Sequence, residues 1–444
     1  MARSLALAAI SALLVACSSP PERNALPLNK AALSGILADP SIRTWGDVEP
    51  NADELHEYTE SFDKQLLVDE QGELRVQNML TISGGGANGA YGAGLLNGLS
   101  ASGERPEYRL VTGISTGAIL GLYAFLGPDY DHKIRQFYTE YSDDNIYSKR
   151  SLFSLFSSSS FLDTQPFVQL VRDEINQDLM AQVAAEHLRG RRFLVKTTNL
   201  DAQRAVIWDM GAIAQYTGEE AETLFENVII ASAAIPGAFE PVLLPVMVDG
   251  EVYDELHVDG GVMAQVFFIP ENLDISVYRQ YESQYLESLG FAPNQNLESR
   301  VWVVSNSKLA SEWQETNPGI FGIMGRSIAT MLRFQTQTNI SLIERQAKLT
   351  SSELKLSYIH HTIPGFPTDA PFDNTYMRWL YCYGYSQGIN PQHWETHAPN
   401  YAALYEQQIA EAEKQQLATD IASFDWEQLQ PGLSARMDQC LNSL

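Results

Sequence analysis

Short blocks of apolar and polar residues alternate along the middle of the chain, and they predict strands that are each followed by a helix. Strands are indicated by short continuous apolar runs, and helices by apolar residues three and four positions apart. Two strand–loop–helix units follow each other directly, at 79–82, 83–89 and 90–99 and then at 108–112, 113–117 and 118–126. This order is typical of a mostly parallel sheet with helices on its faces.

The same pattern continues toward the C-terminus. Further strands are predicted at 192–198, 205–209, 256–259, 300–305 and 354–362, and helices at 221–232, 326–349 and, as a helical tail, 401–417. The segment after residue 17 begins as a Ser/Pro-rich linker and becomes polar and acidic. We therefore divide the chain into a leader, a tether with a packed extension, a main domain and a helical C-terminal tail, at 1–16, 17–75, 76–390 and 391–444.

The first residues predict a secretory leader. Arg3 precedes an uncharged stretch of about 11 residues, which is too short to span a membrane and fits the apolar region of a signal peptide. The alternative is a buried helix that happens to come first. The small residues before Cys17 resemble a bacterial lipobox, which implies that Cys17 is lipidated and becomes the mature N-terminus. By the same resemblance, Ser18 rather than Asp after this cysteine implies the outer membrane of a Gram-negative cell.

Composition and charge narrow the range of partners. The 444 residues include 29 Lys plus Arg against 55 Asp plus Glu, a formal net charge of −26, and removing 1–16 takes away only Arg3 and leaves −27. Nucleic acid is excluded as a general partner, because its binding needs clustered cations. Anionic lipid would also repel the chain at long range. With 19% charged and 10% aromatic residues, the chain is not of the disordered type.

The three cysteines divide into one lipid site and one pair. Once Cys17 carries lipid, Cys382 and Cys440 remain in an oxidising compartment. We predict a disulfide between them, and the alternative is two buried free thiols.

Two serines stand in a Gly-x-Ser-x-Gly pattern, which can place a serine hydroxyl on a sharp strand-to-helix turn. Ser115, between Gly113 and Gly117, has a predicted strand before it and a helix after it. Ser386 follows a segment with helical spacing and precedes Asn390-Pro391, so it lies at a helix end. Context selects Ser115 as the candidate nucleophile.

A nucleophilic serine needs a base. Of the eight histidines none has an obvious catalytic context, and His257, on a strand face, is expected to be structural. Asp259 ends that strand and is followed by Gly260 and Gly261, which let the backbone turn away and leave the carboxylate at the sheet end. The alternative is an ordinary Asp-Gly turn.

The glycine-rich loop permits two chemistries. Gly84, Gly86 and Gly89 fit the dinucleotide-binding pattern, in which a helix N-terminus binds a pyrophosphate. That pattern expects an acidic residue at the end of the second strand, where this chain has Ser115. The same amide donors can instead bind an oxyanion. The serine therefore favours acyl transfer.

Taken together, four motifs resemble the patatin-like phospholipase family: Gly84-Gly85-Gly86-Ala87-Asn88-Gly89, Gly113-Ile114-Ser115-Thr116-Gly117, the stretch from Ala231 to Pro241, and Asp259-Gly260-Gly261. The resemblance covers about 76–270 by motif. It implies a three-layer α/β/α fold, hydrolysis of acyl esters of phospholipids or related lipids without metal or other cofactor, and a Ser115–Asp259 dyad without histidine. It also implies an oxyanion hole built from the amides of 84–86.

One departure concerns Asn88, where the family often has Arg or Lys, so this loop is not anchored by charge and lacks a cation for lipid head groups.

The rival hypothesis is a catalytically quiet envelope lipoprotein that binds lipid or a partner. Two apolar segments, 151–162 and 319–325, are candidates for a lid or a membrane-contacting wall, with ordinary packing as the alternative.

Overall fold

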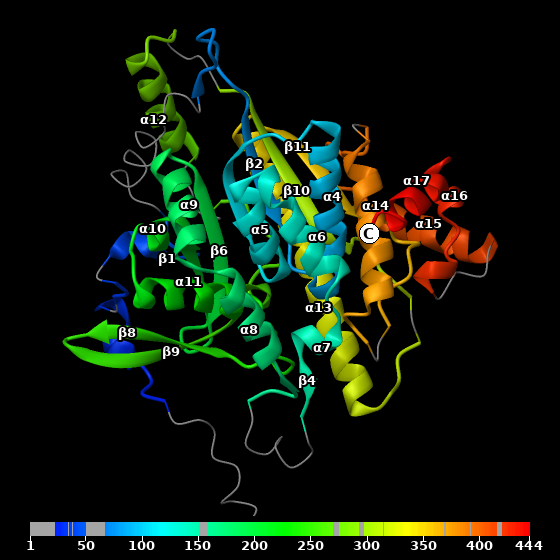
Figure 1. The fold of residues 1–444 in the computed structure, drawn as a ribbon, viewed down its shortest axis with the longest axis horizontal. Coiled ribbons are helices and arrows are strands. Elements are labelled where there is room, and N and C mark those ends of the chain that lie inside the picture. Colours follow the sequence, from blue (N-terminus) through cyan, green and yellow to red (C-terminus); the bar gives the residue numbers. More distant parts are fainter. Residues whose placement is uncertain are drawn as a thin grey trace, which may run out of the picture.

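A nine-stranded mixed sheet forms the centre of the computed structural model (Figure 1). The structure describes residues 23–33, 35–37, 39–49, 67–150, 159–269, 275–292, 297–313, 315–367, 370–390, 392–414 and 420–444. The strands of the large sheet are β1 (Arg43–Trp45), β2 (Gln77–Ile82), β3 (Tyr108–Gly113), β6 (Arg192–Asn199), β7 (Arg204–Asp209), β8 (Val242–Val248), β9 (Glu251–Asp259), β10 (Ser299–Lys308) and β11 (Glu353–Ile359). Two short strands, β4 (Ser148–Lys149) and β5 (Leu162–Asp163), pair separately.

The strand order is β1-β7-β6-β3-β2-β10-β11, and β9 pairs with both β6 and β8. The five neighbouring strands from β6 to β11 run parallel, whereas β1, β7 and β9 are antiparallel to their partners. The chain continues from β2 to β3 on one side and returns to the other side of β2 with β10. The carboxyl ends of these three strands therefore form a topological switch point, which is where α/β sheets place their sites.

Helices cover both faces of this sheet. The longer ones are α4 (Gly89–Ser102), α5 (Thr116–Leu126), α6 (Asp131–Thr139), α8 (Gln165–Glu174), α9 (Gln177–Leu188), α11 (Glu219–Ser232), α12 (Ile275–Ser288), α13 (Ile320–Leu349), α14 (Asn374–Gly388), α15 (Tyr401–Lys414) and α17 (Leu433–Leu441). The shorter ones are α7 (Asp143–Ile146), α10 (Met210–Ala214) and α16 (Trp426–Leu429). None of the helices in the described ranges is long and apolar enough to cross a bilayer.

The side chains of β10 alternate between the two faces of the sheet and show that helices pack on both, which gives three layers. Val301 and Val303 pack into a cluster that includes Ile340 and Ile343 of α13. Val304, on the opposite face, joins the main core with α4, α5, α11 and α14. The predicted α/β fold with a mostly parallel central sheet and a helical C-terminal region is confirmed. Several elements were not predicted, among them β8 and the first half of β9, helices α6, α8, α9 and α12, and the first six residues of α13, whose predicted start was 326.

The N-terminal extension is packed from its first described residue. Arg23 forms an ion pair with Asp201 at 2.6 Å, and the backbone N–H of Asn24 donates to Asp254 of β9. β1 then pairs with β7 and covers that edge of the sheet. Part of the segment predicted as a tether is therefore bound to the main domain, whereas Cys17 lies outside the described residues.

The second Gly-x-Ser-x-Gly pattern is a helix-packing motif. Its flanking residues, Gly384 and Gly388, lie in α14 against α4, where an added Cβ would lie 2.0 Å from the Tyr91 oxygen and 2.3 Å from the Leu95 oxygen. Ser386 is buried, and its Oγ lies 3.9 Å from the sulfur of Met437. The interpretation of Ser386 as non-catalytic agrees with this position.

A disulfide fixes the C-terminal tail to the same helix. Cys382 of α14 and Cys440 of α17 are joined with an S–S distance of 2.00 Å. The bridge closes a segment with a sequence separation of 58 residues, and constraining a loop of that length in the unfolded chain stabilises a fold by about 4 kcal/mol.

Gly384→Ala should destabilise the protein, because the methyl group meets backbone atoms that only a separation of α4 and α14 can move. We expect the free energy of unfolding in urea to fall by about 1–3 kcal/mol. Gly325→Ala is the control, since it is also in a helix but has no atom within 4 Å of the added Cβ. It should be neutral or stabilising by up to about 1 kcal/mol. Equal stability of Gly384→Ala and wild type would contradict the close packing.

Candidate active site

The predicted nucleophile, Ser115, lies in the tight turn between β3 and α5. Its backbone has φ 56° and ψ −127°, a strained conformation for a residue with a side chain. A Cβ on Gly113 would lie 2.2 Å from the carbonyl oxygen of Gly117, and one on Gly117 would lie 2.3 Å from that of Ile82. Both neighbours are glycine because the turn has no space for other side chains.

A buried serine of α11 holds this turn in place. The backbone N–H of Ser115 donates to Oγ of Ser232 at 2.9 Å, and the Ser232 hydroxyl donates to the Lys196 carbonyl of β6 at 2.9 Å. Ser232 is fully buried. Sequence reasoning gave it no role, although its place in the motif from 231 to 241 was a signal.

The predicted base, Asp259, meets Ser115 at the end of β9. This strand runs back along β6 and places Asp259 opposite Thr197, two residues beyond Val195, the partner of Gly113. The Ser115 hydroxyl forms a hydrogen bond with the Asp259 side chain, and the Gly261 N–H donates to the same carboxylate at 2.6 Å.

Burial determines the protonation of this carboxylate. Ser115 and Asp259 are each only 6% exposed. Burial raises the pKa of Asp259 to about 7, although the bonds from the Gly261 amide and the Ser115 hydroxyl act in the opposite direction. A carboxyl group with this pKa can accept and return a proton near neutral pH.

Two glycines after Asp259 allow the turn to fit. A Cβ on Gly260 would lie 2.4 Å from the Lys196 carbonyl oxygen, and one on Gly261 would lie 2.9 Å from the carboxylate itself. The residue pair is thus more than a common turn sequence, since any side chain at Gly260 would displace β9 from β6.

His257 is part of a separate buried network. Its Nδ1 lies 2.9 Å from the Thr197 hydroxyl and its Nε2 lies 3.1 Å from the Glu255 carboxylate, which also pairs with Arg43. Burial lowers the pKa of His257. Because both ring nitrogens have partners other than Ser115, the position agrees with the expected structural role.

The glycine loop after β2 lies beside the nucleophile. A Cβ on Gly84 would come within 3.3 Å of the Ser115 Cβ, so the loop approaches closely because this residue has no side chain. The Gly84 N–H donates to the Gln265 carbonyl at 3.0 Å and is therefore occupied. Within the described chain, the amides of Gly85 and Gly86 have no acceptor. The oxyanion hole built from the amides of 84–86 stays a prediction, and the bond from the Gly84 amide to Gln265 leaves the amides of Gly85 and Gly86 as its expected donors.

Neutral hydrogen bonds hold the glycine loop around Asn88. Asn88 accepts from the Tyr376 hydroxyl of α14 at 2.7 Å, and the Thr116 hydroxyl donates to the Gly86 carbonyl at 3.0 Å. Asn306 is fully buried and donates from its side chain to the Ser83 carbonyl at 3.0 Å. Gly89, where α4 begins, packs against Thr116. These contacts anchor the loop without a charged side chain at residue 88.

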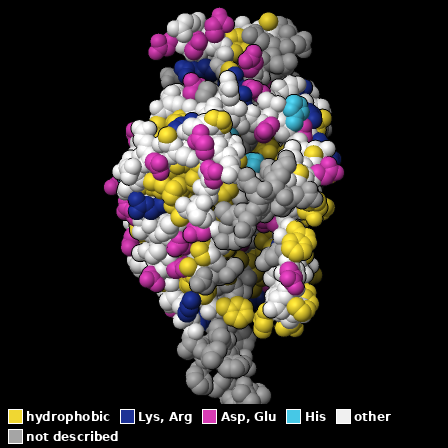
Figure 2. Space-filling model, turned by 90° about the vertical axis from the view of Figure 1, so that its right-hand side faces the viewer, with side chains coloured by type: hydrophobic (Ala, Val, Ile, Leu, Met, Phe, Trp, Pro, Cys, Tyr) yellow, Lys and Arg dark blue, Asp and Glu magenta, His cyan; other side chains and the backbone are white. Residues whose placement is uncertain are grey.

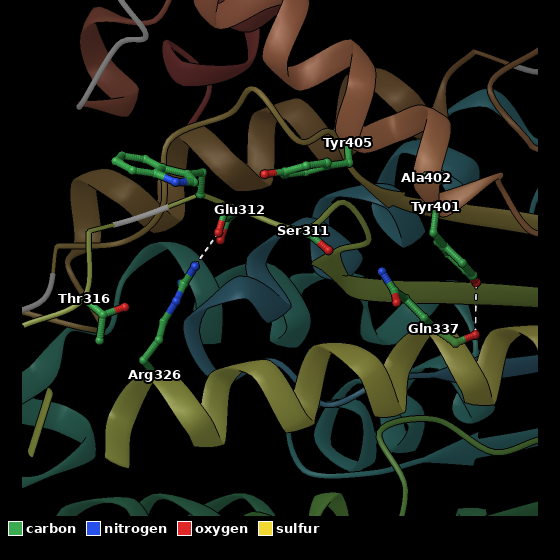
Figure 3. A pocket seen from close by; sticks show the side chains of 9 residues that line it. Ser311, Glu312, Thr316, Arg326, Gln337, Tyr401, Ala402 and Tyr405 are labelled. Atoms are coloured by element: carbon green, nitrogen blue, oxygen red, sulfur yellow. Dashed lines mark hydrogen bonds between the residues drawn. The ribbon is translucent and has the colours of Figure 1, made fainter. Parts of the chain in front are cut away.

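A cavity of about 640 Å³ lies elsewhere in the molecule (Figure 3). Its lining comes from the loop after β10, from α13 and from α15: Ser311, Glu312, Trp313, Thr316, Arg326, Gln337, Tyr401, Ala402 and Tyr405. It contains neither Ser115 nor Asp259. Among the described residues, no group of three or more His, Cys, Asp or Glu side chains is arranged to bind a metal ion.

Ser232→Ala should weaken both the fold and the site, because it leaves the Ser115 amide buried without an acceptor. We expect the free energy of unfolding to fall by about 1–3 kcal/mol, measured with urea. Ser386→Ala, equally buried but with only a weak sulfur partner, should have a smaller effect. If both variants lost the same stability, the bridge through Ser232 would not be important.

A comparison with known proteins identifies the family of the central part of the chain. The sequence model of the patatin-like phospholipase family matches residues 80–270, which include the glycine loop, Ser115 and Asp259. No sequence among the curated proteins matches. Among solved structures, the crystal structure of VipD from Legionella pneumophila is 11% identical, with a TM-score of 0.29, over 84% of this chain and 77% of VipD. Residues 80–270 of this chain are therefore a patatin-like phospholipase domain.

Proposed function

We propose that this protein is a serine acyl hydrolase that cleaves acyl esters of phospholipids or related lipids. The observation that carries the proposal is the hydrogen bond between the Ser115 hydroxyl and the buried Asp259 carboxylate. The glycine loop lies beside this pair, since a Cβ on Gly84 would come within 3.3 Å of the Ser115 Cβ. Nucleophile, base and oxyanion donors are the three groups that acyl transfer requires.

In the first half of the reaction, the Ser115 oxygen attacks the ester carbonyl carbon while its proton moves to Asp259. The amides of Gly85 and Gly86 stabilise the oxyanion of the tetrahedral intermediate. When this intermediate collapses, the bond to the alcohol breaks, and the alcohol leaves with the proton from Asp259. The acyl group is then bound to Ser115 as an ester.

In the second half, a water molecule attacks this ester. Asp259 accepts the proton of the water, the Ser115 oxygen leaves, and the proton returns to it as the fatty acid departs. The carboxyl group is thus a base and then an acid in each half, a role that suits a pKa near neutral pH.

The N-terminal sequence supports a location for this activity. We propose that Cys17 carries the lipid anchor of an envelope lipoprotein, at the outer membrane of a Gram-negative cell, so that the enzyme stays close to its substrate. One acyl chain gives only marginal anchoring, whereas several chains give stable attachment.

Substitution of either dyad residue should abolish ester hydrolysis. We expect Ser115→Ala and Asp259→Asn to lower kcat/KM on a short-chain ester by about 10⁴-fold or more, because each removes a step that the other cannot replace. Ser386→Ala should stay near wild type. Near wild-type activity of Ser115→Ala would refute the assignment.

A fluorophosphonate probe separates the enzyme from a catalytically quiet lipid-binding protein, because it reacts only with an activated serine. Labelling should occur in wild type and in Ser386→Ala and be lost in Ser115→Ala. An unlabelled wild-type protein would favour the quiet alternative.

The pH dependence should report the ionisation of Asp259. The carboxylate form is the base, and its raised pKa means that this form is lost below about pH 7. We therefore expect kcat/KM to rise with pH and to level off above an apparent pKa near 7, measured on a soluble ester whose own chemistry is pH-independent. A profile that is flat between pH 5 and pH 8 would exclude Asp259 as the base.

A further inference from the structure

The first half of α13 exposes a dense group of large apolar side chains. Eight of them lie within one stretch of the helix: Ile320, Phe321, Ile323, Met324, Ile328, Met331, Leu332 and Phe334. Phe321 and Phe334 leave 79% and 69% of their surface exposed. Figure 2 shows hydrophobic side chains gathered on the lower right of one face of the molecule. Contiguous exposed apolar patches mark interaction sites.

Helix periodicity separates these residues from the polar ones. Ile320, Met324, Ile328 and Met331 follow at intervals of four, four and three residues, so they share one face of α13. Arg326 and Arg333, with Gln337 four residues later, share the opposite face. The two rows point in opposite directions from the same helix.

The polar row is bound to the body of the protein. Arg333 donates to the Glu312 carboxylate at 2.8 Å, and Arg326 donates to the Glu312 carbonyl. The Tyr401 hydroxyl of α15 donates to the Gln337 carbonyl at 3.0 Å (Figure 3). Because these contacts hold the polar side inward, the apolar row faces outward.

The apolar row leads toward the proposed catalytic residues. Gln335, four residues after Met331, donates to the Val262 carbonyl at 3.3 Å and accepts from Gln265 at 3.1 Å. Gln265 in turn donates to the Gly261 carbonyl at 2.7 Å, in the turn that follows Asp259. Val262 and Met263 of this turn are also exposed. The apolar surface is therefore continuous with the edge of the active site.

Charge distinguishes this segment from the rest of the chain. The chain carries a formal net charge of −26, yet the sequence from 316 to 343 has no Asp or Glu, and Arg326 and Arg333 are its only charged residues. An anionic lipid surface that repels the remainder of the protein would not repel this segment. α13 is not apolar enough to cross a bilayer, and a helix with one apolar face can lie along the bilayer surface.

We propose that the first half of α13, together with Val262 and Met263, is the surface by which this protein docks on a phospholipid bilayer. The inference rests on the proposed lipid acyl hydrolase function, since the bilayer supplies that substrate. A second copy of the chain on the same surface would cover the edge of the site next to Asp259. A bilayer there would instead present ester groups to Ser115.

Vesicle binding tests the proposal without turnover. The full chain carrying Cys17→Ser and Ser115→Ala is sedimented with phosphatidylcholine vesicles, with and without Phe321→Ser plus Phe334→Ser. We expect the partition coefficient to fall at least about tenfold, because two large apolar side chains no longer enter the bilayer. Leu188→Ser plus Leu349→Ser removes two side chains that are 73% and 62% exposed, at the end of α9 and at the far end of α13, outside the proposed surface, and should not change binding. Equal binding of all three proteins would overturn the proposal.

Activity measurements separate docking from chemistry. With Ser115 intact, Phe321→Ser plus Phe334→Ser should lower the ratio of vesicle phospholipid hydrolysis to soluble ester hydrolysis at least about tenfold. A wild-type protein that binds vesicles through α13 but cleaves neither substrate would refute the proposed function and leave the docking surface standing. A stable dimer by light scattering that the same substitutions dissociate, with unchanged vesicle binding, would assign the surface to self-association and overturn docking.

Discussion

The site depends on a backbone turn that exists only where no side chain fills the space inside it. Gly113 and Gly117 approach backbone atoms too closely for any Cβ, and Ser115 between them adopts a positive φ. Such strain costs on the order of 1–3 kcal/mol and persists when the surroundings over-determine it. Here the surroundings are the sheet, α5 and the Ser232 bridge to Lys196, so the position of the nucleophile is set by packing rather than by its own preference.

The same close packing determines the electrostatics. Asp259 is buried because the turn, β6 and the glycine loop meet around it, and burial favours its neutral form. A more exposed carboxylate would be ionised over a wider pH range but would be a weaker base. In the proposed mechanism, Asp259 gains basicity at the cost of being ionised over a narrower pH range, and it accepts the proton of Ser115 without a histidine as intermediary.

The local sequence was sufficient to predict those parts of the candidate site that consist of a few consecutive residues. The turn around Ser115, the glycine loop and Asp259-Gly260-Gly261 could be predicted because each is a few residues at a strand end. The contacts that hold these segments in place could not be predicted, because they join residues that are far apart in the sequence. Ser232 and Ser115, for example, are 117 residues apart. β8 was not predicted. It contains Pro245, a residue that disfavours a central strand, but a peripheral hairpin tolerates the lost donor. The occupied amide of Gly84 likewise depends on Gln265, which only the fold brings near.

The ion pair of Arg23 with Asp201 has a consequence for how far the molecule could move from a membrane. If Cys17 is lipidated, only six peptide units separate the anchor from a residue fixed on the domain, a reach of about 20 Å. Asp254, next to this attachment, lies in the β8–β9 hairpin, which Figure 1 draws in the lower half of the molecule together with the start of α13. A linker this short would keep α13 at a high effective concentration near the bilayer. Even weak contacts between its apolar side chains and the lipid would then form often.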